Sequence, residues 1–270
     1  IPESARWYMK RGETTDAIRI ICKTLHDLPG AMKDCISQFR LSHPTINEKP
    51  DVKSQPYSVL FSKEMRKRTI LVTVPWFLMD VVFYGIGIFT PLLLAAMAFE
   101  GSGTNFIADD ILATEGTAFL DIFLIIGFIL NIILIERIGR MKLQIIGFTG
   151  MAVGLGILII GSLYNSTMIG LLFVGFAIYN LLMNMGPNAT TFVLPAELYP
   201  TEMRATAHGF AAGIAKLGAA LGIILVPILK EGWGIPVTLG VMFGLVILAL
   251  IITFLCRIET TGRSLEEITD

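Results

Sequence analysis

Long apolar runs dominate the chain after residue 69. Residues 1–69 are polar, and from Ile70 onward apolar stretches alternate with short charged or Gly/Pro-rich breaks. A helix needs about 20 apolar residues to cross the hydrocarbon core of a bilayer. The pattern therefore predicts six membrane spans, at residues 70–99, 111–135, 143–163, 168–194, 205–229 and 233–256.

These spans are expected to be helices. The lipid core offers no water to a free backbone N–H or C=O, so only helices and closed barrels cross it. The chain lacks the ten-residue segments of alternating polarity that are typical of a membrane barrel. We predict an all-α integral membrane protein, with a six-transmembrane-helix bundle at residues 70–256 and a tail at residues 257–270.

Basic residues gather on one side of the predicted spans. They are Lys63, Arg66, Lys67, Arg68, Arg137, Arg140, Lys142, Arg204, Arg257 and Arg263. Only Lys230 falls on the opposite side. Because loops rich in Lys and Arg stay inside, we expect the polar segment 1–69, the loops at 136–142 and 195–204 and the C-terminus to be cytoplasmic.

The polar segment at residues 1–69 is predicted to contain amphipathic helices. Thr14 and Thr15 can cap one such helix, and a second is expected near residues 31–41. The segment is either a latch that packs under the bundle or a passive linker, and the linker is the simpler interpretation. No chemistry is predicted for it.

Composition and charge narrow the class of protein. With 54% hydrophobic and 16% charged residues, the chain is too apolar for a soluble domain of this size, and a net charge of -1 leaves no basic surface for nucleic acid. No nucleophile elbow, metal-ligand cluster or phosphate-cradling glycine loop occurs, so neither an enzyme nor a cofactor is predicted. The chain opens at Ile1 without an initiator Met, and we expect a piece of a longer protein.

Ionisable and polar side chains near the middle of a span carry the functional signal. Burying a charge there costs about 2.5–3.5 kcal/mol even on a lenient insertion scale. Asp80 and Lys216 are each expected about 15–18 Å from the cytoplasmic end of their spans, and Asn184 about 15 Å. The sequence therefore predicts one polar layer built by three helices.

Trp76, Asp80 and Tyr84 are spaced by four residues and lie along one stripe of the first span. A carboxylate between an indole N–H and a phenol O–H can receive a small polar solute. The alternative is a permanent buried strut between Asp80 and Lys216.

Other polar or small residues of the spans have simpler interpretations. Asn180 and Asn188 are expected to cross-link helices, and Asp121 either lines a vestibule or bonds a neighbouring helix. His208 either joins a proton path or is an ordinary interfacial histidine. Glycine pairs four residues apart predict close helix packing, with sliding contacts as the alternative; they are Gly150 with Gly154, Gly209 with Gly213, Gly218 with Gly222, and Gly240 with Gly244.

Four motifs resemble the sugar-porter-like branch of the major facilitator superfamily. They are Ile1 to Trp7 (IPESARW), Glu136 to Arg140 (ERIGR), Pro195 to Arg204 (PAELYPTEMR) and Glu259 to Ser264 (ETTGRS). Their signature residues are Glu136, Arg137, Gly139, Arg140, Pro195, Glu197 and Arg204. The resemblance implies that the chain is a central loop followed by helices seven to twelve, and that its partner is an amino-terminal six-helix half.

Further blocks resemble the phosphate:proton symporters of that branch. They are WFLMD at 76–80 followed by FY at 83–84, NMGPNATTF at 184–192, RATAHG at 204–209 and KLGA at 216–219. The resemblance implies that Trp76, Asp80, Tyr84 and Asn184 contact phosphate, and that Asp80 and Lys216 take part in proton coupling. Met141 and Ala196 depart from the family pattern and leave the exact substrate open.

The sequence therefore predicts a secondary active transporter in the plasma membrane. We expect uptake of inorganic phosphate together with protons by alternating access, in which protonation of Asp80 frees Lys216 for the anion. The alternatives are a transporter of another small solute, such as a sugar, an organic acid or an organic cation, and a six-helix fragment that does not transport. The expected partners are the solute, protons, membrane lipid and the amino-terminal half.

Overall fold

The computed structural model describes residues 13–25, 56–98, 106–164, 169–263 and 267–268, together with Ala5 and Tyr8. Its helical elements are α2 (Thr14–Leu25), the 3-10 turn η2 (Tyr57–Phe61), α4 (Arg66–Ala98), α5 (Phe106–Ile138), α6 (Arg140–Leu163), α7 (Ile169–Met185), α8 (Pro187–Leu198) and α9 (Thr201–Cys256). Within these ranges no residue lies in a strand, which confirms the all-α prediction. The helix expected near residues 31–41 and most of the first motif lie outside the described residues.

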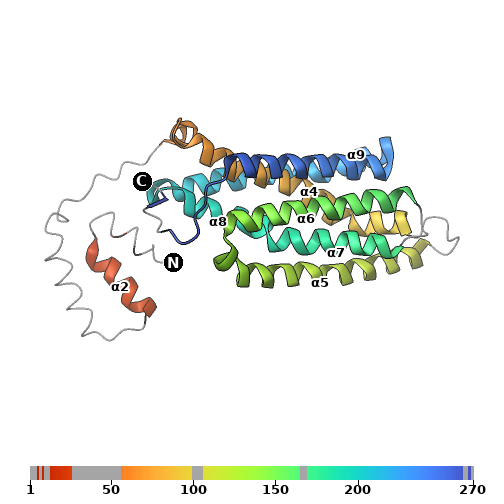
Figure 1. Cartoon of the computed structure of the whole chain (residues 1–270), viewed down its shortest axis with the longest axis horizontal. Helices are drawn as coiled ribbons and strands as arrows, with labels where there is room; N and C mark the ends of the chain where they lie inside the picture. The colour runs from red at the N-terminus through yellow and green to blue at the C-terminus, as the bar shows by residue number, and fades with distance from the viewer. Residues whose placement is uncertain are drawn as a thin grey trace.

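The long helices lie side by side along one axis (Figure 1). Five helical segments of the described chain are long and apolar enough to cross a membrane, with α7 and α8 counted together. Charged residues at the start of α4, α6 and α9 lie at the same end of this bundle, which we call the basic end.

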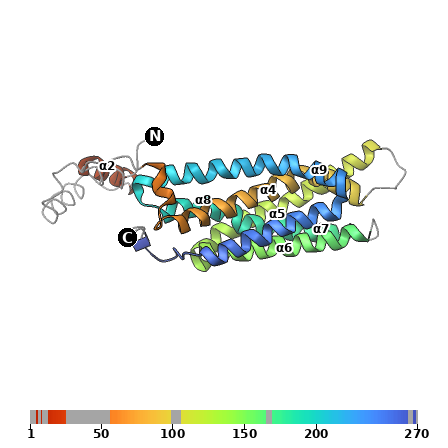
Figure 2. The ribbon, with the colours of Figure 1, turned by 90° about the horizontal axis from the view of Figure 1, so that it is seen from above.

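The element α9 comprises two membrane passes rather than one. Its 56 residues would extend roughly 84 Å as a single helix, whereas the hydrocarbon core is about 30 Å thick. At Gly234 the backbone leaves the helical region, with φ 81 and ψ 173. Figure 2 shows α9 running away from the basic end and then returning to it. The bundle is therefore crossed six times, with the reversal close to the predicted break at residues 230–232.

The span expected at 168–194 corresponds to one apolar crossing at Ile169–Leu198, which consists of two helices rather than one. It divides into α7 and α8 at Gly186, where φ is -114 and ψ is -103. Pro187 has no N–H to give to a carbonyl of the preceding turn, so the helical ladder cannot pass through it unbroken. The break follows Asn184 by two residues and so lies beside the predicted polar layer.

Glycines bring α4 and α9 into backbone contact. A Cβ atom on Gly218 would meet the Phe77 carbonyl, and one on Gly222 would meet the Val81 carbonyl. The predicted close packing is confirmed for this pair. Nothing lies within 4 Å of a Cβ placed on Gly209, Gly213, Gly240 or Gly244, so a side chain at these positions would meet none of the described residues.

A buried polar junction joins the start of α4 to the end of α8. The Thr69 hydroxyl lies 2.8 Å from the Tyr199 hydroxyl and donates to the Leu60 carbonyl at 2.7 Å. Burial raises the pKa of the Tyr199 phenol, so this hydroxyl keeps its proton and can donate to Thr69. Beside it, the Arg68 guanidinium donates to the Ile268 carbonyl at 2.7 Å, so the tail also packs at the basic end.

Gly222→Ala is expected to destabilise the bundle, because the added methyl group would overlap the Val81 carbonyl and lie 3.1 Å from the Gly85 nitrogen. Overpacking of this kind costs about 1–3 kcal/mol, so the Tm of the detergent-purified protein should fall by several degrees. Gly244→Ala is the matched control, since its methyl group meets nothing within 4 Å. An unchanged Tm for Gly222→Ala would contradict the contact between α4 and α9.

Candidate functional site

An ion pair between α4 and α9 forms the centre of the candidate site. The Lys216 ammonium donates to Asp80 Oδ2 at 3.0 Å and to the Tyr84 hydroxyl at 3.2 Å. It also lies 4.8 Å from the centroid of the Tyr84 ring. The structure therefore brings together Asp80, Tyr84 and Lys216, and it places the Trp76 side chain beside the same carboxylate.

The two partners of this pair differ in their access to solvent. The Asp80 side chain is 3% exposed, whereas the Lys216 side chain is 56% exposed. Removing a carboxylate from water costs several kcal/mol unless a cation and hydrogen bonds offset the loss. Lys216 offsets the charge of Asp80 and still presents an open side, so its ammonium can exchange the carboxylate for another anion.

Trp76 lies one helical turn from Asp80 toward the basic end and is almost fully buried. Its ring centroid is 4.5 Å from that of Phe192 on α8 and 5.6 Å from that of His208 on α9. Three helices thus contribute one ring each to an aromatic cluster beside the ion pair. The cluster separates the ion pair from the basic end on this side of the bundle.

Asn184 has partners on its own helix and on α8, and its contact with the solute stays a prediction. Its side chain is 1% exposed, and its amide donates to the Asn180 carbonyl at 3.0 Å. Its Oδ1 accepts a hydrogen bond from the Asn188 amide at 2.7 Å. No hydrogen bond joins Asn184 to Asp80 or Lys216 in the described part of the chain. Asn188 is half-buried and is the more accessible of the two amides.

The structure adds α5 to the site, which the sequence interpretation missed. The Asn131 amide donates to the Met185 carbonyl at 2.6 Å, and Gly127 lies where any Cβ would be 2.9 Å from Asn184 Cβ. The sequence offered one signal for this contact, the amide side chain of Asn131 within the long apolar run of α5. Asn180, in contrast, forms the expected cross-link, since its amide donates to the Leu120 carbonyl at 3.3 Å.

The remaining polar candidates, Asp121 and His208, form no hydrogen bond with the ion pair among the described residues. Asp121 is exposed on α5, so its vestibule role stays a prediction. His208 contacts Trp76 and Phe192 through its ring, which neither supports nor excludes a proton path. Among the described residues, no group of three or more His, Cys, Asp or Glu side chains could hold a metal ion.

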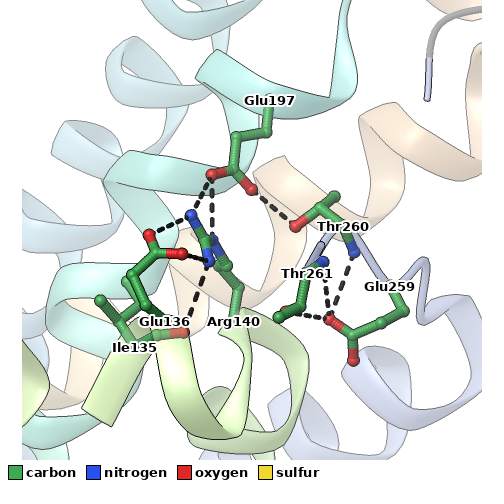
Figure 3. A network of polar contacts seen from close by, with 7 residues as sticks. All are labelled: Ile135, Glu136, Arg140, Glu197, Glu259, Thr260 and Thr261. Atoms are coloured by element: carbon green, nitrogen blue, oxygen red, sulfur yellow. Dashed lines mark hydrogen bonds and ion pairs between the residues drawn. The ribbon is translucent and has the colours of Figure 1, made fainter. Parts of the chain in front are cut away.

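The signature residues form a polar network at the basic end (Figure 3). The Arg140 guanidinium pairs with Glu136 at 2.6 Å and with Glu197 at 2.9 Å. The other oxygen of Glu197 accepts a hydrogen bond from the Thr260 hydroxyl at 2.6 Å. The network therefore joins α5, α6 and α8 to the segment that follows α9.

The other signature residues surround this network. Gly139 has φ 99, and a Cβ there would lie 2.6 Å from Thr261 Oγ1, so glycine is required on both counts. Pro195 is buried within α8, and Arg204 donates to the Tyr199 carbonyl at 3.3 Å. Arg137 is exposed.

Sequence comparison places these features in a known family. A family model described as sugar (and other) transporter matches residues 1–270. The inorganic phosphate transporter 1-1 of Arabidopsis thaliana is 30% identical over 97% of this chain and 54% of its own length. A Schizosaccharomyces pombe protein named for inorganic phosphate transport is 34% identical over 75% of this chain and 35% of its own length. The chain thus spans about half, or less, of the curated relatives it matches.

Solved structures agree on the fold. A proton:xylose symporter of the major facilitator superfamily, bound to 6-bromo-6-deoxy-D-glucose, matches with a TM-score of 0.73 over 99% of this chain and 54% of that one. The sequences are 20% identical, so the likeness concerns the fold alone. The family resemblance read from the sequence is confirmed. The chain belongs to the sugar (and other) transporter family of the major facilitator superfamily, and its integral membrane bundle is one six-helix half of that fold.

Proposed function

We propose that the protein to which this chain belongs takes up inorganic phosphate together with protons, by alternating access. The observation that carries the proposal is the pair of Asp80 and Lys216, in which a buried carboxylate holds a half-exposed ammonium at 3.0 Å. The names of the relatives from Arabidopsis thaliana and Schizosaccharomyces pombe support phosphate as the solute.

The proposed cycle begins with protonation of Asp80. A neutral carboxyl no longer holds Lys216 by charge, so the ammonium becomes available to an anion. Phosphate then accepts hydrogen bonds from Lys216, from the Tyr84 hydroxyl and from the protonated Asp80. Trp76 closes the site toward the basic end, and the amides of Asn184 and Asn188 extend the wall along α7 and α8.

Release follows from the reverse step. When Asp80 loses its proton, its carboxylate repels phosphate and competes for Lys216. The ion pair re-forms and the anion leaves, so proton and phosphate move together. In this scheme the ion pair with Lys216 keeps Asp80 charged while the site is empty. Asp80 therefore carries few protons across the membrane without solute.

The proposal includes an amino-terminal six-helix half as partner. This chain supplies one wall of the site, and rocking of the two halves exposes it to either side. We place the protein in the plasma membrane. In this proposal the basic end and the C-terminus face the cytoplasm, because Lys and Arg gather at that end.

Transport of another small solute by the same fold is the second candidate. It is favoured by one observation, that the Asn184 side chain bonds Asn180 and Asn188 and forms no hydrogen bond with the ion pair within the described chain. Under that alternative, Asp80 and Lys216 act as a strut or in proton coupling alone.

Asp80→Asn is expected to abolish proton-driven phosphate uptake, because an amide can neither carry the coupling proton nor release Lys216 on demand. Uptake of labelled phosphate is measured in proteoliposomes that contain the natural full-length protein and an imposed proton gradient. Glu231→Gln removes an exposed carboxylate near the reversal of α9, at the end of the bundle opposite the basic end, and should transport normally. Undiminished coupled uptake by Asp80→Asn would rule out the proposed cycle.

Substrate competition separates phosphate from the other solutes. An excess of unlabelled phosphate should suppress labelled uptake, whereas an equal excess of xylose, citrate or tetraethylammonium should not. The same proteoliposomes serve for all four competitors. Uptake of one of those solutes, with no effect of phosphate, would establish the second candidate.

Lys216→Met is expected to lower the Tm, because it leaves the Asp80 carboxylate buried without its cation. Loss of one partner of a fully buried pair costs about 3–5 kcal/mol, and the half-exposed position of Lys216 predicts a smaller loss. Adding Asp80→Asn removes the uncompensated charge and should restore part of the Tm. Equal Tm values for the single and double variants would show that the two charges do not interact.

A further inference from the structure

The break between α7 and α8 leaves a backbone carbonyl without a helical partner. In an unbroken helix, the N–H of Ala189 would bond the Met185 carbonyl, four residues earlier. Here that N–H bonds the Gly186 carbonyl at 3.2 Å instead. Met185 is buried, and a buried carbonyl that lacks a partner costs free energy comparable to a lost hydrogen bond.

Asn131 on α5 supplies the missing donor. Its amide reaches the Met185 carbonyl at 2.6 Å, and its own side chain is 5% exposed. An amide in a membrane span is costly unless it is bonded, so this contact also satisfies Asn131. The hydrogen bond therefore meets the needs of both helices at the position where α7 ends.

The surface of α5 beside Asn131 is shaped for the same contact. Gly127 lies one turn earlier on the same face, and a Cβ there would overlap the Leu181 carbonyl and lie 2.9 Å from Asn184 Cβ. The α5 backbone at Gly127 thus touches Asn184, the residue before Met185. The end of α7 cannot move closer to α5 at this point. Asn131 and Gly127 together fix the end of α7 from one side.

The other side of the break is held by a separate chain of hydrogen bonds. The Thr190 hydroxyl lies 3.1 Å from the Gly186 carbonyl and 2.9 Å from Gln144 Oε1. The Gln144 amide in turn donates to the Thr253 hydroxyl at 3.2 Å. These bonds tie the start of α8 to α6 and α9. The Asn131 contact holds the other side of the break, where α7 carries Asn184.

We propose that Asn131 is a positioning residue for the anion site. It fixes the end of α7 through the Met185 carbonyl, and thereby sets the direction in which the amides of Asn184 and Asn188 project. This inference rests on the proposed phosphate function of the same site. It assigns to α5 a role in affinity, although no α5 side chain bonds Asp80 or Lys216 in the described part of the chain.

Asn131→Leu tests the inference, because it keeps a similar volume and removes the donor. We expect phosphate binding to the purified natural full-length protein to weaken about tenfold, which corresponds to about 1.4 kcal/mol. In proteoliposomes the KM should rise while the maximal rate stays near that of the unmodified protein. Asn131→Ser, whose hydroxyl is too short to make the same contact, carries the same expectation if Asn131→Leu does not fold.

Asn180→Leu is the matched control. It removes another α5–α7 hydrogen bond, from the Asn180 amide to the Leu120 carbonyl, at a position away from the break. It should lower the Tm about as much as Asn131→Leu and leave the affinity nearly unchanged. Equal loss of affinity in the two variants, or none in either, would overturn the positioning role. If the unmodified protein binds no phosphate, the proposed function fails, and this inference fails with it.

Discussion

The ion pair between Asp80 and Lys216 depends on the close approach of α4 and α9. An ammonium can reach a buried carboxylate only if the helices that carry them pack nearly backbone to backbone. Gly218 and Gly222, which follow Lys216 on α9, permit that approach because any side chain there would meet the backbone of α4. The same glycines therefore bring the two helices together and place the two charges within reach of each other. The rest of the site is arranged around this contact.

A second constraint is that every break in a helix must be satisfied from within the protein. The break at Gly186 is closed by Asn131 on one side and by Thr190 with Gln144 on the other. At the basic end the same requirement is met by charge, since Arg140 joins the carboxylates of two helices and Glu197 continues to the tail.

The exposed positions of the bundle agree with a half that needs a partner. Lys216 is half-exposed although it lies at mid-depth of a membrane helix, and most residues of the span Ala113–Ile138 of α5 are not buried. Asp121 is exposed on the same helix, in a setting where lipid would not accept its charge. A second half that covers these surfaces would enclose the ion pair and complete the wall that faces it.

The sequence by itself determined the class of the protein, the approximate spans and the residues of the central pair. Spans follow from the length of apolar runs, and Asp80 and Lys216 are recognisable because a charge in a membrane helix is costly wherever the helix lies. Only the tertiary structure decided that α7 ends before Pro187, that Asn184 bonds its own neighbours, and that Asn131 reaches Met185. The apolar pattern does not predict the end of α7, because some membrane helices accommodate proline, as Pro75 and Pro91 do within α4. The partners of an amide depend on the rotation and separation of neighbouring helices, which apolar periodicity along one chain does not specify.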